Sequence, residues 1–382
     1  MAEKKRILIS GAGIAGLTSA LWLERQGFDV TIVEKARSIR AGGFLISLSH
    51  HAYHYAEQLG IMPVLKQHDM GITHSSYHGP RGTELLALDY GKMFNRVDVI
   101  QMLRDDFNSV LYDETKNKAD IRFGDPIETL SINGERADVK LTSGLEKSYD
   151  LVIGADGLHS VVRELVFNDS DIKKHYLDLC CAAFRLPNVL DLDNKFETHM
   201  ERDQYMAAFS TGHGDIGAVF VWDSNRRTTP LRPERTAILD TTYQNSSSTI
   251  RKVIEHCPQQ EAIYMDYLMQ VEASSWSKGP VVLIGDAAHS LTLFSGRGAA
   301  AAFSGASRLA LALQQQNSIS TALQQYESEM RPVIQAIQPA TRRAVRWYVP
   351  RNTLTQKLRD NGMRLLPNWL FRSYFQLKYS NI

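Results

Sequence analysis

Six residues near the start of the chain decide its fold: Gly11-Ala12-Gly13-Ile14-Ala15-Gly16. They follow the apolar run Arg6–Ser10, which is typical of a buried parallel strand. They precede residues 17–23, whose apolar side chains recur at helical spacing. A strand, a glycine turn and a helix in this order predict a dinucleotide-binding unit, with phosphates on the free N–H groups of the helix.

Each glycine of this turn has a predicted task. Gly11 permits the tight turn, Gly13 lets a pyrophosphate approach the backbone, and Gly16 allows the helix to pack closely on the strand. A second strand over residues 29–34 ends in Glu34, where a ribose hydroxyl needs an acceptor. An ordinary glycine turn is the alternative interpretation. The predicted dinucleotide contacts are Gly11, Gly13, Ile14, Ala15, Gly16, Glu34 and Lys35.

Two later stretches also follow strand-like apolar runs. The first is Gly154-Ala155-Asp156-Gly157, after a predicted strand that starts at Tyr149. The second is Gly285-Asp286-Ala287-Ala288-His289, after a predicted strand over residues 281–284. Taken alone, the first could equally be a turn whose acid caps a helix. The three stretches together resemble the class A FAD-dependent monooxygenases, the para-hydroxybenzoate hydroxylase family. The resemblance runs from residue 4 to about residue 345. Segments 34–43, 149–167 and 275–279 are most similar to the tetracycline-inactivating members.

The resemblance implies further FAD contacts. Asp156 and Gly157 would lie near the pyrophosphate and the transient nicotinamide cofactor, with Arg163 holding that segment in place. Asp286, beside Gly285, would bind the ribityl chain, while His289 is expected to be structural. A helix starting near Ala299 would point its N-terminus at the flavin ring and stabilise negative charge there. The remaining residues implied by the match are Arg40, Gly43, Arg96, Gly296 and Gly298.

The chain departs from the family pattern near the predicted flavin ring. Leu293 stands where proline is usual, Arg297 where glutamine is usual, and Ala300 and Gly305 where asparagine and aspartate are usual. Backbone contacts to the ring would survive these changes, but side-chain contacts would not. A catalytically weak or inactive FAD protein that sequesters an aromatic ligand is therefore one alternative. A flavin-dependent reductase or halogenase of the same fold is another.

Length and composition indicate a globular protein of about two domains, with 382 residues, 43% hydrophobic residues and 22% charged residues. The net charge of +1 argues against general nucleic-acid binding. Cys180 and Cys181 are neighbours and Cys257 is remote, so a disulfide framework is not expected. The start of the chain resembles no signal peptide and no run suits a bilayer span, which predicts a cytoplasmic protein. A monomer or a homodimer is expected.

The predicted fold is α/β: a Rossmann-like FAD-binding domain with an inserted β-sheet substrate domain and C-terminal helices. The split FAD-binding domain takes residues 1–70, 95–175 and 270–320, and the substrate domain takes 71–94 and 176–269. Alternating residues over 182–186 and 216–222 predict strands of the second sheet. Phe209, Phe220 and Trp222 are the predicted substrate contacts, with plain sheet core as the alternative.

Residues 321–382 are predicted to be helices that bridge the two domains. From residue 340 onward the chain holds nine arginines or lysines and one acid, Asp360, together with several aromatic residues. A basic aromatic segment can also lie on an anionic membrane surface, which is the alternative.

A metal site is not expected. His50, His54 and Glu57 fall on one predicted helix, but the pattern lacks the further ligands of a zinc site. No catalytic side chain is predicted either, because the cofactor would carry the chemistry. The predicted enzyme binds FAD tightly without a covalent bond and uses NAD(P)H as a transient co-substrate. Through a flavin C4a-hydroperoxide it would hydroxylate an aromatic or polycyclic phenolic molecule, with tetracycline-type antibiotics as one candidate class.

Overall fold

The structure is a computed structural model that describes residues 4–39, 44–94, 98–365 and 370. Six strands form the first sheet, in the order β17-β18-β11-β1-β2-β7. All of its pairs are parallel except β17 with β18. The strands are β1 (Arg6–Ser10), β2 (Asp29–Glu34), β7 (Asp120–Phe123), β11 (Leu151–Gly154), β17 (Ser277–Lys278) and β18 (Val281–Leu283).

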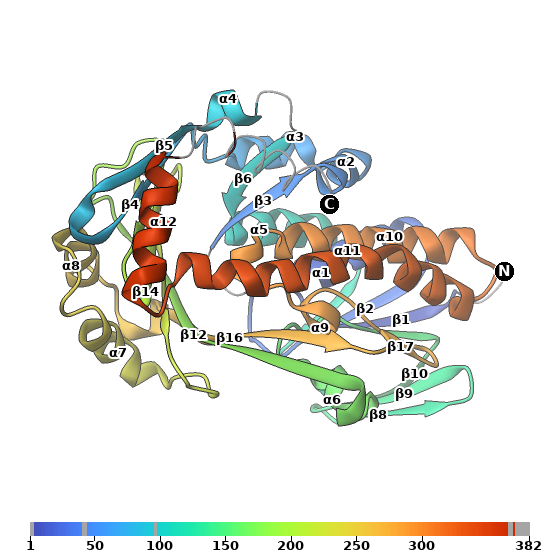
Figure 1. Ribbon diagram of the computed structural model, residues 1–382. Coiled ribbons are helices and arrows are strands. Elements are labelled where there is room, and N and C mark those ends of the chain that lie inside the picture. Colours follow the sequence, from blue (N-terminus) through green and yellow to red (C-terminus); the bar gives the residue numbers. More distant parts are fainter. Residues whose placement is uncertain (1–3, 40–43, 95–97, 366–369, 371–382) are drawn as a thin grey trace.

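Helices and a small sheet cover the two faces of this first sheet (Figure 1). The helices are α1 (Ile14–Arg25), α5 (Arg104–Thr115) and α10 (Gly298–Gln315), and α1 contacts both of the others. The small sheet consists of β8 (Ile127–Asn133), β9 (Arg136–Leu141) and β10 (Glu146–Tyr149). Because both faces are covered, β1 and β11 are apolar and buried along almost their whole length.

The predicted strands at residues 6–10, 29–34 and 281–284 are confirmed in this sheet. The prediction of one strand starting at Tyr149 is wrong, because Tyr149 ends β10 and Leu151 begins β11. Asp150 lies between them, and its Oδ2 accepts a hydrogen bond from the Arg6 backbone N–H at 2.7 Å. A polar residue in an apolar run therefore marks the change of sheet.

Seven strands form the second sheet, in the order β16-β12-β15-β14-β13-β4-β5. They are β4 (His74–His78), β5 (Glu84–Asp89), β12 (Ile172–Pro187), β13 (Lys195–Met200), β14 (Gln204–Ser210), β15 (Asp215–Asp223) and β16 (Tyr264–Ala273). The strands predicted at 182–186 and 216–222 are confirmed as parts of β12 and β15. Strands β12 and β16 pair with each other across the predicted domain boundaries near residues 175 and 270, with a shift of register between Tyr176 and Cys180.

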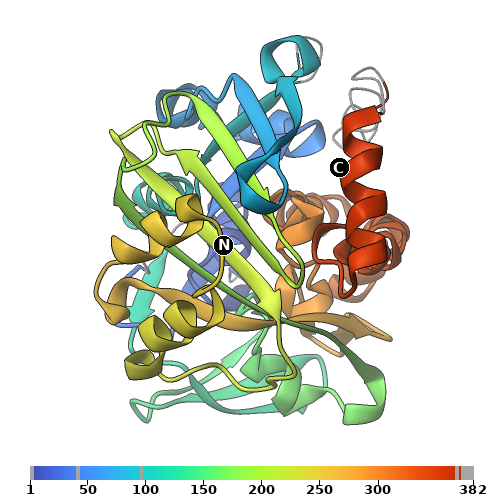
Figure 2. The same cartoon turned by 60° about the vertical axis from the view of Figure 1, so that its left-hand side comes forward.

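The two faces of the second sheet have different neighbours. Helices α7 (Arg235–Thr242) and α8 (Ser248–Glu255) cover the outer face (Figure 2). The inner face packs on the ladder of β3 (Leu45–Ser49) with β6 (Val99–Leu103), and on the C-terminal helices. The remaining short elements are α2 (His51–Gln58), α3 (Met62–Leu65), α4 (Tyr90–Phe94), α6 (Val161–Val166), α9 (Asp286–His289), η1 (Lys66–His68), η2 (Pro80–Gly82), η3 (Asp169–Asp171), η4 (Arg232–Glu234), η5 (Gln260–Ala262) and η6 (Leu293–Ser295).

The C-terminal helices contact both sheets. Helix α11 (Ile319–Tyr348) lies beside α10 (Figure 1), and its Gln338 amide donates to the carbonyl oxygens of Val271 and Ser290. Helix α12 (Thr353–Leu365) docks through Arg359, whose guanidinium is fully buried and donates to the Met200 carbonyl oxygen at 3.1 Å. These contacts are the ones that a bridging role requires. Among the residues that the structure describes, no helix is long and apolar enough to cross a membrane.

Candidate functional site

Three loops meet at the carboxyl ends of neighbouring strands. Strands β18, β11 and β1 lie side by side in the first sheet. Each is followed by one of the motifs found in the sequence, so residues 11–16, 154–157 and 285–289 share one edge. In open α/β sheets, ligands bind outside the carboxyl ends of the strands. The sheet order therefore brings the three motifs to the place where such a fold binds its ligand.

The glycine-rich turn is tightly packed at two glycines and open at the third. Gly11 has φ of +109°, and a Cβ there would lie 2.5 Å from the Ala155 carbonyl oxygen. A Cβ on Gly16 would lie 1.9 Å from the Gly11 carbonyl oxygen, so the helix approaches the turn closely. A Cβ on Gly13 would meet nothing within 4 Å. The protein thus leaves space beside Gly13, at the N-terminus of α1, where an anion is favoured.

The Glu34 carboxylate lies beside the glycine turn and also accepts a hydrogen bond from the backbone of that turn. One carboxylate oxygen accepts the backbone N–H of Ala12 at 3.0 Å, and the other accepts that of Ala36 at 2.8 Å. Each carboxylate oxygen has a second lone pair, so these bonds leave acceptor capacity for a ribose hydroxyl. Lys35 is exposed at the end of β2, and Ile14 and Ala15 are buried in the first turn of α1.

Asp156 shows features of both interpretations made from the sequence, a helix cap and a cofactor contact. Its Oδ2 accepts the backbone N–H groups of Val161 and Val162, at 2.8 and 3.1 Å, and so caps α6. Its Oδ1 is buried and has no hydrogen-bond partner within the described ranges of the chain. Desolvation raises the pKa of this carboxyl group above its usual range. An orphaned carboxylate oxygen next to the Gly11 turn indicates a partner that the protein itself does not supply. Gly157 follows with φ of +82°.

Arg163 joins two of the three motifs. Its side chain is buried, and it donates to the Leu158 carbonyl oxygen at 2.7 Å and to the Ala287 carbonyl oxygen at 2.9 Å. Desolvation lowers the pKa of its guanidinium, and Asp156 opposes that shift. Arg163 therefore fixes the loop after β11 against helix α9.

Asp286 lies at the centre of the site. The side chain is accessible to solvent, yet it is surrounded by enough protein that desolvation raises its pKa, with Arg104 opposing the shift. Within the described part of the chain its carboxylate makes no hydrogen bond. A Cβ on the preceding Gly285 would lie 3.2 Å from Ala15 and 3.4 Å from Ala302, so α1, α9 and α10 converge here. This carboxylate is free to accept a ligand's hydroxyl groups.

The segment after α9 leads into α10 beside this centre. Gly296 has φ of +64° and ends η6, and α10 begins at Gly298, where a Cβ would meet nothing within 4 Å. Arg297 and Ala299 are half-buried. The first N–H groups of a helix have no partner inside it, so this N-terminus can receive negative charge.

The residues that depart from the family pattern are packed against other parts of the protein. Ala300 is buried in the core of the first sheet's domain, and Leu293 packs near Phe294 and Tyr348. A Cβ on Gly305 would lie 3.5 Å from Met330 of α11. Ala300, Leu293 and Gly305 therefore belong to the packing of the helices around the site.

His289 is a neutral residue that packs in the protein interior. Desolvation lowers the pKa of its imidazole to about 4. The ring is buried and packs on Trp276, with centroids 4.7 Å apart. It is therefore uncharged at neutral pH.

Sequence reasoning missed Arg104, Tyr264 and Phe44. Arg104 is exposed at the first position of α5 and acts electrostatically on both Asp286 and Tyr264. The Tyr264 ring packs edge-on against Phe44 at 5.0 Å. A cation in the first turn of a helix is unfavourable there, which is the signal that could have identified Arg104. The predicted contacts Arg40, Gly43 and Arg96 lie outside the described residues.

The three predicted substrate contacts lie on two different faces. Phe209 is on the inner face of the second sheet, where it stacks on Phe196 at 5.8 Å. Phe220 and Trp222 are on the outer face, buried against Tyr243 of the segment that follows α7. Alternation along a strand puts residues 220 and 222 on one face, away from the first sheet. Phe220 and Trp222 therefore match the alternative interpretation, in which they are core residues of the sheet. Only Phe209 remains a candidate for contact with the substrate.

The predicted histidine helix is also corrected. Helix α2 begins at His51, and His50 precedes it with φ of +49°, outside helical geometry. The prediction that His50 falls on the same helix as His54 and Glu57 is therefore wrong. His54 instead pairs with Glu57 at 3.0 Å.

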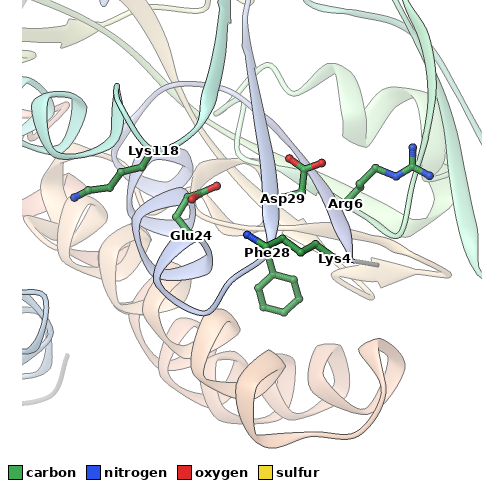
Figure 3. A pocket seen from close by; sticks show the side chains of 6 residues that line it. All are labelled: Lys4, Arg6, Glu24, Phe28, Asp29 and Lys118. Carbon is green, nitrogen blue, oxygen red and sulfur yellow. The ribbon is translucent and has the colours of Figure 1, made fainter. Parts of the chain in front are cut away.

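A cavity of about 390 Å³ lies elsewhere, at the amino ends of β1 and β2. Figure 3 shows its lining: charged side chains of both signs surround Phe28. The glycine turns lie at the opposite ends of these strands. This cavity therefore does not belong to the site.

The fold and the site define a class of dinucleotide-binding flavoprotein. An open turn at Gly13, an unpartnered Asp286 and an orphaned Asp156 oxygen fit an extended ligand with phosphates and a polyol. The FAD binding domain family matches residues 4–341, and the chain belongs to this family. It is accordingly an enzyme of the FAD-dependent monooxygenases, as the sequence predicted.

Three similar proteins agree with this assignment. A flavin-dependent monooxygenase from an unknown prokaryotic organism is 30% identical over 344 residues, covering 88% of this chain and 89% of that protein. The crystal structure of tetracycline destructase Tet(51) has a TM-score of 0.81 and 27% identity, covering 95% of this chain and 96% of its own. Klebsiella pneumoniae HpxO, solved with FAD and uric acid, has a TM-score of 0.85 at 19% identity, covering 99% and 97%, and supports the fold.

Proposed function

We propose that this enzyme binds FAD across the three motifs and uses NAD(P)H and O2 to hydroxylate an aromatic or polycyclic phenolic small molecule. The observation that carries the proposal is the convergence of the open Gly13 turn and the unpartnered Asp286 carboxylate at one sheet edge. FAD supplies the redox chemistry when bound: it accepts a hydride and activates oxygen. In sum, substrate, O2, NAD(P)H and a proton give the hydroxylated product, NAD(P)⁺ and water.

Different residues would hold different parts of FAD. The turn at Gly11, Gly13, Ile14, Ala15 and Gly16 would hold the pyrophosphate, and Glu34 with Lys35 would face the adenosine ribose. Asp286 would accept hydrogen bonds from the ribityl hydroxyl groups, and Gly296, Gly298 and Ala299 would lie along the ring. Asp156 and Gly157 would complete the site near the pyrophosphate. Arg40, Gly43 and Arg96 remain sequence predictions for the same cofactor.

The chain's own contribution to the reaction is electrostatic and geometric. The N-terminus of α10 favours negative charge at the adjoining part of the site. Arg104 adds a positive charge near Asp286. Apolar side chains of the inner face would exclude water from the site and so limit wasteful release of hydrogen peroxide.

The inner face of the second sheet suits an aromatic substrate. Tyr205, Phe294 and Tyr348 form a cluster of rings whose centroids lie 5.5 to 6.2 Å apart. Phe209 and Tyr264 lie on the same side of the sheet. The likeness to a tetracycline destructase, at 27% identity over nearly the whole chain, supports tetracycline-type phenols as the first compounds to test.

A mass-spectrometric screen tests this proposal. FAD-loaded protein is incubated with NAD(P)H, O2 and a panel of tetracyclines, simple phenols, pyridines and polycyclic quinones. We expect a product one oxygen atom heavier, formed only when substrate and NAD(P)H are both present. The Gly13→Val variant, which should lack FAD, is the matched negative control. Tight binding of panel compounds without NAD(P)H oxidation would favour the inactive ligand-binding alternative and overturn the proposal.

A further inference from the structure

Two histidines and a glutamate lie together on the outer face of the second sheet. Strands β4 and β13 pair in parallel, with His78 directly opposite His199. Glu197 and His199 alternate with Phe196 and Met200, which belong to the inner-face cluster. The His78, Glu197 and His199 side chains therefore face away from the FAD site, beyond the area that α7 and α8 cover.

The three side chains converge within the span of one metal ion. One nitrogen of each histidine and one carboxylate oxygen of Glu197 all lie within 4.8 Å of one another. The two imidazole rings are nearly parallel, with centroids 4.8 Å apart and an angle of 13° between their planes. Glu197 Oε2 lies 3.4 Å from His199 Nε2. Elsewhere in the described ranges, no other three histidine, cysteine or acidic side chains meet in this way.

The neighbours of His78 prepare one nitrogen to act as a ligand. Its Nδ1 lies 3.4 Å from the Gly82 carbonyl oxygen, which can only accept, so that nitrogen carries the proton. Its Nε2 is then the unprotonated nitrogen, which accepts a hydrogen bond from the Ser76 hydroxyl group at 2.9 Å and which a metal ion would take over as a ligand. A backbone carbonyl that fixes the imidazole tautomer is the usual support of a metal-binding histidine.

His199 supplies a second, independent indication. Its side chain is 4% exposed, and its Nδ1 is buried with no hydrogen-bond partner among the residues that the structure describes. Buried polar atoms are normally satisfied, so Nδ1 lacks a partner that the protein does not provide, whereas Nε2 faces Glu197 at 3.4 Å. An entry path exists, because a cavity of about 400 Å³ reaches the cluster and is lined by His78 and Glu197.

We propose that His78, Glu197 and His199 bind a divalent transition-metal ion of the zinc type, with water completing its coordination. Two imidazoles and one carboxylate are ligands that Zn²⁺ favours, whereas Mg²⁺ and Ca²⁺ prefer sites made of oxygen alone. The ion would join β4 to β13, which are far apart in the sequence. Its task is therefore to hold together β13 and β4, the two strands nearest to the edge strand β5, in the sheet whose other face borders the substrate side.

Calorimetric titration of ZnCl2 into full-length, tag-free, metal-stripped protein with its FAD tests the site. We expect one equivalent of zinc to bind, and MgCl2 to give no binding. At a hundredfold excess over Kd, zinc should raise the melting temperature by about 3 °C for a chain of this size. His78→Gln, Glu197→Gln and His199→Gln should each weaken zinc binding at least about tenfold.

His54→Gln is the matched control, since His54 also pairs with a glutamate but has no third ligand nearby among the described residues. It should leave the zinc titration unchanged. If a cluster variant fails to fold, X-ray absorption on the zinc-loaded parent protein decides. We expect imidazole nitrogens at about 2.0–2.1 Å. Sulfur scattering, no zinc uptake, or equal zinc affinity in a folded cluster variant would overturn the proposal.

Discussion

Gly13 and Gly16 differ in what a side chain would meet at each position. A Cβ on Gly13 meets no protein atom within 4 Å, whereas a Cβ on Gly16 would lie 1.9 Å from the Gly11 carbonyl oxygen. A Cβ at residue 13 would thus conflict only with a bound ligand, whereas a Cβ at residue 16 would conflict with the fold itself. Substitutions at the two glycines separate cofactor binding from folding.

Replacing Gly13 with valine should abolish FAD retention while leaving the protein folded. The side chain would occupy the space proposed for the pyrophosphate without a clash inside the protein. The ratio of absorbance at the flavin and protein bands, together with far-ultraviolet circular dichroism, measures both effects. Gly16→Val is the contrast and should lose folded protein. A fully flavin-loaded Gly13→Val protein would refute the placement of FAD.

Replacing Asp286 with alanine should weaken FAD binding by about tenfold to a hundredfold, because a hydrogen bond to a charged group contributes about 1.5–3 kcal/mol. Asp286→Asn keeps one acceptor oxygen and should fall between the parent and the alanine variant. Titration of flavin-free protein with FAD, followed by flavin fluorescence, gives the three Kd values. Equal affinities would remove Asp286 from the site.

The raised pKa of Asp286 also predicts a pH dependence in the flavin-free protein. Folding favours the protonated form of this group, so its contribution to stability is present below its ordinary pKa of 3.8 and is lost as pH rises through the raised value. Asp286→Asn cannot ionise. The variant should therefore gain stability relative to the parent as the pH rises above 3.8. Melting temperatures across this range test the sign, and a difference independent of pH would contradict it.

At the scale of single elements, α12 depends on one buried cation. Arg359 donates to the carbonyl oxygens of Tyr348 and Met200, both at 3.1 Å, and pairs with Asp360 at 2.9 Å. The helix thereby connects the end of α11 to strand β13. Met363 of the same helix packs into the inner-face cluster of the second sheet.

Arg359→Met should destabilise the docking of α12, since two buried carbonyl oxygens and Asp360 would lose their partner. A cost of about 3–5 kcal/mol is typical when one partner of a buried ion pair is removed. We expect a lower melting temperature and a raised KM, with FAD content unchanged because α12 lies outside the three motifs. Arg364→Met, on the exposed side of the same helix, should change neither quantity.

The elements also show how far sequence reasoning reaches. The strands and glycine turns of the first sheet were predictable, because buried runs and turn residues are local signals. The face on which Phe220 and Trp222 lie was not, since alternation shows that they share a face but not which layer covers it. The importance of Arg104 was equally hidden, because Asp286 is distant in the sequence and only the fold brings the two charges together.

For the whole molecule, FAD should act as a stabilising ligand. The proposed site joins segments around residues 11, 156 and 286, so binding requires the folded arrangement of all three. At a concentration a hundredfold above Kd, FAD should raise the melting temperature of flavin-free protein by about 3 °C. Differential scanning calorimetry at several FAD concentrations measures the shift. The Gly13→Val variant should show none, and an equal shift there would place FAD elsewhere.

The strand order of the first sheet has a consequence for synthesis on the ribosome. Strand β18 is the last parallel strand to be made, at residues 281–283, yet it pairs directly with β11 near the centre of the sheet. Until then the growing chain carries β11 with one uncovered edge and no third loop for the cofactor. Such edges invite wrong pairing while translation continues. If the flavin requires all three loops, as proposed, it cannot bind until about three quarters of the polypeptide has been made.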